Sequence, residues 1–196
     1  MNEESGDGWI TPPSVPPFMG TERFSTGDFG VVDFWRFAMS NLKMNNVRGY
    51  CAEFLVHRAL GSTSPREEWA GHDAETEDGT RIEVKTSAYL QAWDQRRLST
   101  IQFTGLRSKL WNPRTGEADK ATYNADVYVF SVQTARSHEE YDPLDLAQWE
   151  FHIVPGSVLV ALNQKSMALS TVRKHSGGAV GFHGLGDAIR AVSAGG

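Results

Sequence analysis

Three charged residues between positions 70 and 89 have types and spacing suited to catalysis. Asp73, Glu83 and Lys85 fall within "AGHDAETEDGTRIEVKTSAY", where two short alternating runs flank an Asp-Gly turn. Carboxylate oxygens are ligands that Mg²⁺ and Mn²⁺ prefer, and a nearby ammonium can hold a water or offset charge on a phosphate oxygen. The pattern therefore favours metal-assisted chemistry on a phosphate group.

The same segment predicts a β-hairpin, for which two registers are open. A two-residue Asp-Gly loop sets Ala74 opposite Glu83 and mixes apolar with charged residues on each face. A three-residue loop over 77–79 ends with Gly79 in the left-handed conformation that glycine tolerates, and it sets Ala74 opposite Ile82. We predict the second register, because a slip of one residue would turn the charged side chains into the core.

In the second register Asp73 faces Glu83, with their Cβ atoms roughly 5 Å apart. Like charges at this separation destabilise a sheet, and a bound divalent cation removes that penalty. Lys85 shares this face, whereas the opposite face is apolar. The alternative is a solvated face without function, on which Glu75 and Arg81 form only a cross-strand ion pair. The apolar face consists of Ala74, Ile82 and Val84.

A helix is predicted upstream of the hairpin over residues 47–60, "VRGYCAEFLVHRAL", and it should stop at Gly61. Glu53 lies at the edge of its apolar stripe and adds a third carboxylate to the candidate set. The single cysteine, Cys51, lies on the stripe, so burial is expected rather than a role as nucleophile. The stripe consists of Val47, Cys51, Phe54 and Leu55.

The remaining pattern predicts one domain over residues 29–196, preceded by a flexible arm over residues 1–28 that holds "TPPSVPP". A first helix should begin at Val31, and Asn45 and Asn46 should break it from the second. Helices lead, strands follow and short helices close the chain, an order that favours an α/β or α+β fold around one central sheet. Beyond the hairpin we expect strands at 98–103, 125–132 and 149–154, a loop or short helix at 138–148, and helices at 157–162 and 185–192.

Composition limits the classes of function. The chain has 196 residues and a formal net charge of -5, so only a local basic patch could bind nucleic acid. One cysteine excludes an internal disulfide and a four-cysteine cluster. No apolar run is long enough to span a membrane, and the acidic start "MNEESGDGW" lacks the pattern of a signal peptide. The expected location is cytoplasmic.

Asp73, the hairpin and Glu83-Val84-Lys85, preceded by a helix that carries Glu53, resemble the PD-(D/E)XK nuclease superfamily. Restriction endonucleases and Holliday-junction resolvases belong to this superfamily, and the match covers about residues 46–105. The resemblance implies a restriction endonuclease-like core, with a central mixed β-sheet flanked by helices. The proline that precedes the family's Asp is His72 here, which our register places on the core side as a packed residue.

The resemblance also implies a role for each matched residue. Asp73 and Glu83 would hold Mg²⁺ or Mn²⁺, with the Val84 backbone carbonyl as a further ligand. Glu53 would complete the site directly or through a water, and Lys85 would orient or activate the attacking water. The implied reaction is hydrolysis of DNA phosphodiester bonds with one or two metal ions, leaving 5′-phosphate and 3′-hydroxyl ends.

A local reversal of charge follows the hairpin, in "TSAYLQAWDQRRLSTIQFTGLRSKLWNPR". Basic residues can track phosphates, and aromatic residues can stack on unpaired bases. The aromatic residues here are Tyr89, Trp93 and Trp111, although core packing is an equally open role for Trp93. The predicted nucleic-acid surface consists of Gln91, Arg96, Arg97, Arg107 and Lys109.

The sequence thus favours a metal-dependent DNA endonuclease of phage defence and restriction or of DNA repair and recombination. The alternatives are a catalytically silent nucleic-acid-binding module, a subunit of a nuclease complex, and a structural protein with a charged hairpin. DNA is the expected partner, and the resemblance leaves open a homodimer and a protein partner that supplies specificity. Whether the DNA is duplex, branched or single-stranded is not determined by these residues.

Overall fold

The computed structural model describes residues 8–10 and 12–195 of the chain. They fall into two units, one that ends at Ser40 and one that begins at Asn41. The sequence predicted an arm over residues 1–28, of which residues 1–7 and 11 lie outside the described residues. The observed division comes later in the chain than residue 28.

Helix α1, Val31–Met39, lies in the first unit and begins where the sequence predicted a helix. The Gly30 N–H donates a hydrogen bond of 2.8 Å to the carboxylate of Asp33, which caps the first turn. An acidic side chain at this end also interacts favourably with the positive end of the helix dipole. The start of α1 is therefore set by local capping.

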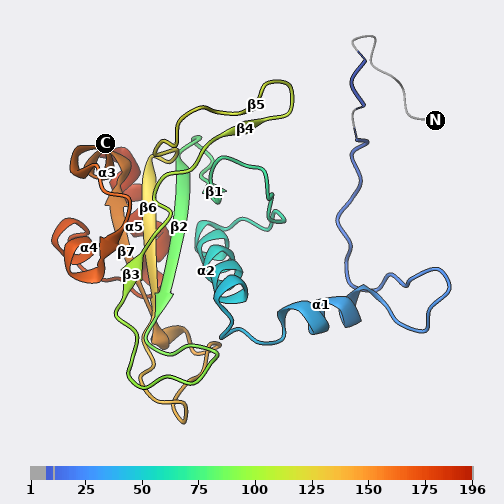
Figure 1. Ribbon diagram of the computed structural model, residues 1–196, viewed down its shortest axis with the longest axis horizontal. Coiled ribbons are helices and arrows are strands. Elements are labelled where there is room, and N and C mark those ends of the chain that lie inside the picture. Colours follow the sequence, from blue (N-terminus) through green and yellow to red (C-terminus); the bar gives the residue numbers. More distant parts are fainter. Residues whose placement is uncertain (1–7, 11, 196) are drawn as a thin grey trace. The chain divides into compact units, whose positions relative to one another are not determined.

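A four-stranded mixed sheet lies at the centre of the second unit, in the order β1-β2-β6-β7 (Figure 1). β2 and β6 are parallel, whereas β1 pairs with β2 and β7 with β6 in antiparallel fashion. A mixed α/β fold built on one central sheet is therefore confirmed. The strands are β1, Ala74–Glu75; β2, Arg81–Ala88; β6, Val127–Gln133; and β7, Trp149–Pro155.

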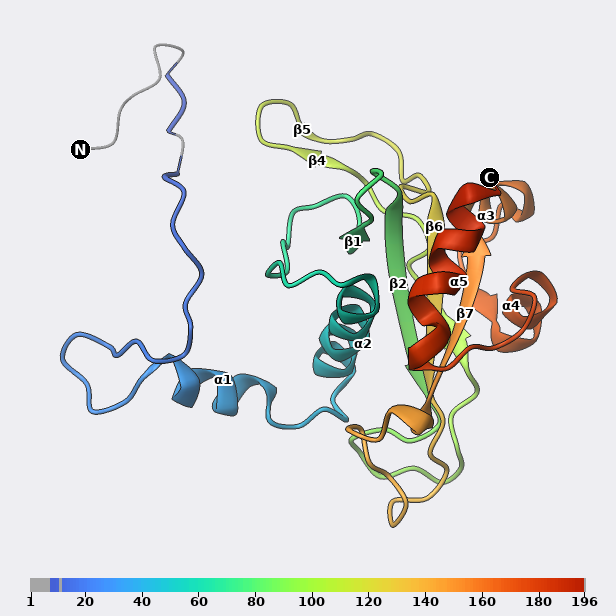
Figure 2. The ribbon, with the colours of Figure 1, turned by 180° about the vertical axis from the view of Figure 1, so that it is seen from behind.

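Each face of the sheet is covered by its own set of helices. α2, Asn45–Leu60, and α5, Phe182–Ala194, lie on one face (Figure 2). Their buried residues pack against the apolar side chains of β2. α3, Gly156–Leu162, and α4, Leu169–His175, pack on the other face, beside a small sheet of β3, Gln102–Phe103, and β8, Met167–Ala168. With both faces covered, all seven residues of β6 are buried, which explains its unbroken apolar run.

Several local predictions are wrong in detail. Asn45 and Asn46 begin α2 instead of breaking a helix, and α2 ends as predicted at Gly61, which has a φ of 82°. Phe54 is exposed, because the buried stripe of α2 turns toward Ala52 and Val56. The 3₁₀ helix Leu146–Gln148 lies within the loop or short helix predicted at 138–148. Additional short elements lie outside the predicted set: α4, β8, and the hairpin of β4, Trp111–Asn112, and β5, Gly116–Glu117.

Within the described residues, no helix has both the length and the apolar character needed to cross a membrane.

The packing of α5 on α2 depends on the absence of a side chain at Gly186, where a Cβ would collide with the Ala59 carbonyl oxygen. Gly186→Ala should lower the free energy of unfolding by about 1–3 kcal/mol, because the two helix backbones must separate. Gly184→Ala is the matched control, since a Cβ there meets open space and helix propensity rises. Urea denaturation measures both, and equal stability of the two variants would contradict the close approach.

Candidate active site

The hairpin adopts the predicted three-residue loop. Ala74 pairs with Ile82 and Glu75 with Arg81, and the Thr76 N–H donates 3.1 Å to the Thr80 carbonyl. Gly79 closes the loop with a φ of 84°, in the left-handed region. The apolar face is buried as expected at Ala74, Ile82 and Val84.

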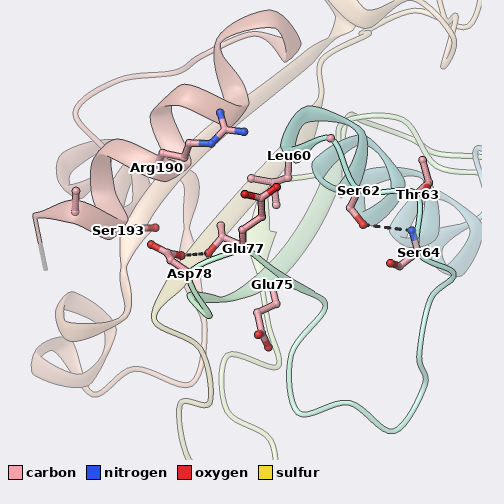
Figure 3. A pocket seen from close by; sticks show the side chains of 12 residues that line it. Leu60, Ser62, Thr63, Ser64, Glu75, Glu77, Asp78, Arg190 and Ser193 are labelled. Atoms are coloured by element: carbon pink, nitrogen blue, oxygen red, sulfur yellow. Dashed lines mark hydrogen bonds between the residues drawn. The ribbon is translucent and has the colours of Figure 1, made fainter.

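A pocket of about 760 Å³ lies beside the hairpin turn (Figure 3). Its lining carries Glu75, Glu77 and Asp78, whereas its one basic residue, Arg190, is ion-paired with Asp187 at 3.3 Å. Such a surface repels the charge of a phosphate ester. Within the described residues, the lining includes none of the predicted site residues, so this pocket is not the predicted site. The predicted residues lie at the other end of the hairpin, around Asp73.

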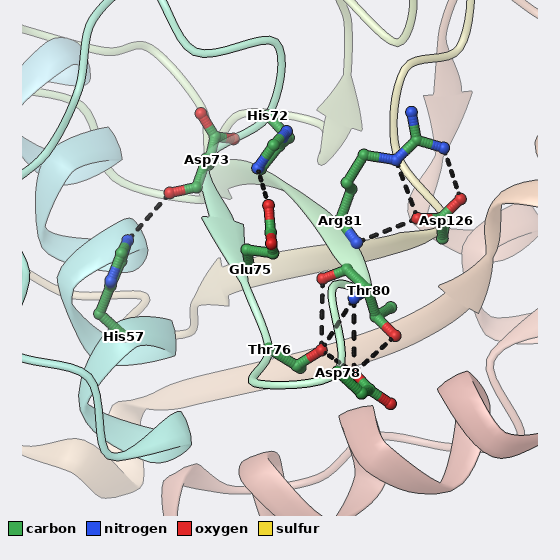
Figure 4. Close-up of polar contacts among 9 residues, drawn as sticks. All are labelled: His57, His72, Asp73, Glu75, Thr76, Asp78, Thr80, Arg81 and Asp126. Atoms are coloured by element: carbon green, nitrogen blue, oxygen red, sulfur yellow. Dashed lines mark hydrogen bonds and ion pairs between the residues drawn. The ribbon is translucent and has the colours of Figure 1, made fainter.

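Contacts on both sides hold Asp73 in place. Its N–H donates 2.9 Å to the Ile82 carbonyl, and its own carbonyl accepts 2.9 Å from His57 Nε2 (Figure 4). Its Oδ2 accepts a hydrogen bond of 2.7 Å from the Val84 N–H. His57 is anchored in turn at Ser62 Oγ, 3.3 Å from Nδ1. The carboxylate is therefore fixed against the edge of β2, next to the Glu-Val-Lys segment.

Glu83 and Lys85 point to the same face of β2, as the alternation of a strand requires. The Lys85 Nζ donates to Glu83 Oε1 at 2.5 Å, with side-chain exposures of 23% for Lys85 and 12% for Glu83. Burial raises the pKa of Glu83, and the charge of Asp73 raises it further, while the charge and hydrogen bond of Lys85 lower it. The net rise means that the charge and hydrogen bond of Lys85 do not offset the combined effect of burial and the Asp73 charge on Glu83.

Glu53 projects from α2 toward the same acidic centre. Burial raises the pKa of Glu53, Asp73 raises it further, and the hydrogen bond and charge of Arg66 lower it. The Arg66 Nε donates 2.7 Å to Glu53 Oε2, and its guanidinium lies 4.9 Å from the centre of the Tyr50 ring. Asp73 is thus the common neighbour that couples Glu53 to the hairpin.

The residues present fit a divalent cation in their chemistry. Asp73 Oδ1, Glu83 Oε2 and Glu53 Oε1 have no hydrogen-bond partner within the described part of the chain. In residues 8–10 and 12–195 no three acidic, His or Cys side chains are close enough to hold a metal as they stand. Mg²⁺ needs only one or two carboxylates, because waters and substrate phosphates complete its shell.

The Val84 carbonyl also faces this region. Ile82 turns its carbonyl toward Asp73, and Val84 turns its N–H the same way. Residues two apart in a strand present their amide groups to the same edge, and the N–H and carbonyl of one residue share that edge. A backbone oxygen is therefore available beside the two carboxylates.

Two expectations about the hairpin are wrong. His72 is half-buried and contacts Glu75, with 3.1 Å between Nε2 and Oε2, instead of packing in the core. Arg81 pairs with Asp126 at 2.7 Å instead of Glu75 (Figure 4). Asp126 directly precedes β6, the parallel neighbour of β2, and its carboxylate accepts hydrogen bonds from both the backbone N–H and the guanidinium of Arg81.

The predicted nucleic-acid residues do not form one surface. Gln91 is buried and bonds Ala88, Ser99 and Arg48. Arg96 and Arg97 are exposed beyond the carboxyl end of β2. Arg107 and Lys109 flank Ser108, which pairs with Thr122 in the segment that leads into the amino end of β6. Arg107 contacts Asn163, and Lys109 contacts Glu117 of β5, the strand labelled in Figure 1.

Sequence reasoning missed three residues of this region: His57, Arg66 and Trp69. The partner of Arg66 lies 13 residues earlier in the chain, and that of Trp69 is Trp111. No periodicity connects such positions. The one available signal was His57, a polar residue one turn from Glu53 on the same edge of its helix.

Comparisons of the sequence with protein-family models and with curated proteins find no match.

The pKa of Glu83 leads to a prediction about stability in metal-free buffer. Because this pKa is raised above 4.5, the group stabilises the fold below that pH, and the contribution is lost as pH rises through the folded-state pKa. Gln does not ionise, so Glu83→Gln should gain free energy of unfolding relative to the parent between about pH 4 and pH 7.

Chemical denaturation at both pH values measures this difference, with Glu77→Gln in the exposed turn as control. If the free energy of unfolding of Glu83→Gln differs from that of the parent by the same amount at both pH values, then ionisation of Glu83 does not oppose folding.

Proposed function

We propose that this protein is a metal-dependent endonuclease that hydrolyses DNA phosphodiester bonds on a PD-(D/E)XK, restriction endonuclease-like core. The observation that carries the proposal is the gathering of Asp73, Glu83 and Lys85 at one end of the hairpin, where the Val84 N–H donates 2.7 Å to Asp73 Oδ2 and Lys85 Nζ donates 2.5 Å to Glu83. A charged hairpin that served only solubility would gain nothing from holding the Asp73 charge beside Glu83, whose pKa that charge raises. Carboxylate oxygens at this centre can bind a divalent cation, and a bound divalent cation can in turn bind the oxygens of a phosphate ester.

The arrangement of the elements supports the same proposal. A helix that carries Glu53 precedes the antiparallel β1–β2 hairpin, and β2 then pairs in parallel with β6. This places the two carboxylates of the hairpin and the ammonium on one strand pair, with the third carboxylate on the packed helix α2. Phage defence, restriction, repair and recombination are all compatible with such a core.

The residues that would hold Mg²⁺ or Mn²⁺ are Asp73 through Oδ1, Glu83 through Oε2 and Val84 through its carbonyl. When bound, the cation supplies charge neutralisation at the phosphate and a water of lowered pKa. Glu53, whose Oε1 has no partner among the described residues, can accept a hydrogen bond from a water at this centre.

The cations of the chain itself act on the substrate. The Lys85 ammonium can orient an attacking water or offset charge on a non-bridging phosphate oxygen once Glu83 turns to the metal. The Arg66 guanidinium is stacked on Tyr50 and held at Glu53 through Nε. Its two terminal amino groups, which have no bonded partner among the described residues, can bind a phosphate in bidentate fashion.

Cleavage assays test the proposal. The purified protein is incubated with supercoiled plasmid, linear duplex and single-stranded DNA, with and without Mg²⁺ or Mn²⁺. Metal-dependent cutting is expected, and Lys85→Ala should lower its rate about a hundredfold or more while the fold is retained. Asp73→Ala is the control for a contaminating nuclease, because it removes a proposed metal ligand.

Metal-dependent cutting that persists in Asp73→Ala would assign the activity to a contaminant. An unchanged rate in Lys85→Ala would remove Lys85 from the mechanism. DNA binding without any cutting would favour the silent binding module instead.

Salt dependence tests the exposed pair Arg96 and Arg97. If both contact phosphates, replacing them with Ala should reduce the slope of log K against log salt by about 2, close to 0.9 for each contact. Arg190→Ala is the control, since that guanidinium is paired with Asp187. Binding isotherms at several salt concentrations give the slope, and an unaltered slope would place the DNA elsewhere.

A further inference from the structure

Two tryptophan side chains lie against each other on the surface near Asp73. Trp69 is 71% exposed and Trp111 is 48% exposed. Their ring centroids are 5.2 Å apart, with planes inclined by 43°. Large aromatic rings left in water lose the stabilisation of burial, so a paired and exposed set of this kind marks a binding surface.

The pair joins two segments that are far apart in the sequence. Trp69 belongs to the loop between α2 and β1, and Trp111 belongs to β4. Leu110 approaches the loop so closely that a Cβ at Gly71 would lie 2.6 Å from its Cδ2. The β4–β5 hairpin is closed by the bond from Lys109 to Glu117, at 2.8 Å. The two rings are therefore held by the surrounding structure.

The pair is close to the proposed reaction centre. Trp69 precedes Asp73 by four residues, so their Cα atoms are at most about 14 Å apart. The same loop carries Arg66, which is bonded to Glu53. A strand with its phosphate at Asp73 would reach the rings within a few nucleotides.

The chemistry of the surface favours bases over phosphates. The loop and the hairpin carry both signs of charge: the basic residues Arg66, Lys109 and Arg114, and the acidic residues Glu67, Glu68 and Glu117. A surface of mixed charge gives little of the electrostatic affinity on which duplex binding depends. Indole rings instead stack on any base whose face is uncovered, and in a duplex the neighbouring pairs cover those faces.

We infer that Trp69 and Trp111 form a stacking platform for unpaired bases. The inference rests on the proposed function where it names the substrate: DNA with a single-stranded portion, as in a flap, a junction or a free strand, in preference to continuous duplex. The stacking itself does not depend on cleavage.

Binding of the full chain in EDTA tests the platform, with fluorescence anisotropy of labelled oligo(dT) and of a blunt hairpin duplex as the readout. Trp69→Ala and Trp111→Ala should each weaken oligo(dT) binding about tenfold or more and leave duplex binding unchanged. Trp69→Phe and Trp111→Phe keep a ring and should retain most of the affinity. Leu144→Ala, at a side chain 76% exposed beyond the far end of β6, should change neither.

An equal loss on both probes, or no loss on oligo(dT), would overturn the platform. Thermal unfolding of each variant shows whether its fold is retained, and the Phe variants separate the loss of a ring from any loss of structure. The cleavage assay separates the two proposals. If oligo(dT) binding depends on the two Trp residues but no DNA is cut, the platform is supported and the nuclease is ruled out. If cutting depends on Asp73 but the Trp→Ala variants bind oligo(dT) as the parent does, the nuclease is supported and the platform is ruled out.

Discussion

The hydrogen bond from the Val84 N–H to Asp73 Oδ2 is the contact on which the candidate site depends. It attaches the residue before β1 to the edge of β2 at the centre of the Glu-Val-Lys segment. With the loop fixed by Gly79, no other register lets Ala74 stay buried while Asp73 reaches this edge. The rest of the arrangement follows from that anchor, including the carbonyl bond from His57.

This anchor also places the charge of Asp73 beside two further carboxylates, Glu83 and Glu53. Asp73 raises the pKa of both Glu83 and Glu53, and among the described residues the compensating ion pairs come from Lys85 and Arg66. Structures usually avoid such conflicts, and those that persist are concentrated at functional sites. The cation that we propose at this centre would neutralise the acidic charge that the sheet itself does not need.

The sequence was sufficient for the hairpin because two short-range rules agreed there. A period of two separated the apolar and charged faces, and the left-handed Gly79 selected the loop length. The buried strand β6 was recognisable because both its faces are covered, which leaves an unbroken apolar run. Predictions failed where the outcome depended on distant parts of the fold. Arg81 pairs with Asp126, which lies 45 residues later, and Phe54 is exposed to solvent instead of packing in the core. The bond between Arg66 and Glu53 and the contact between Trp69 and Trp111 join separate segments, which no local pattern encodes.

The short length of β1 has a consequence for how the molecule avoids self-association. β1 pairs with β2 only over Arg81 and Ile82, so the rest of that edge has no strand partner in the described part of the chain. An open edge invites another chain to add a strand, and charged side chains, lysine above all, oppose such pairing. Glu83 and Lys85 lie on the part of β2 that β1 leaves without a partner, so the side chains proposed for chemistry also place charge where another strand would pair. A variant neutralised at both positions would present a less charged edge to its neighbours in solution.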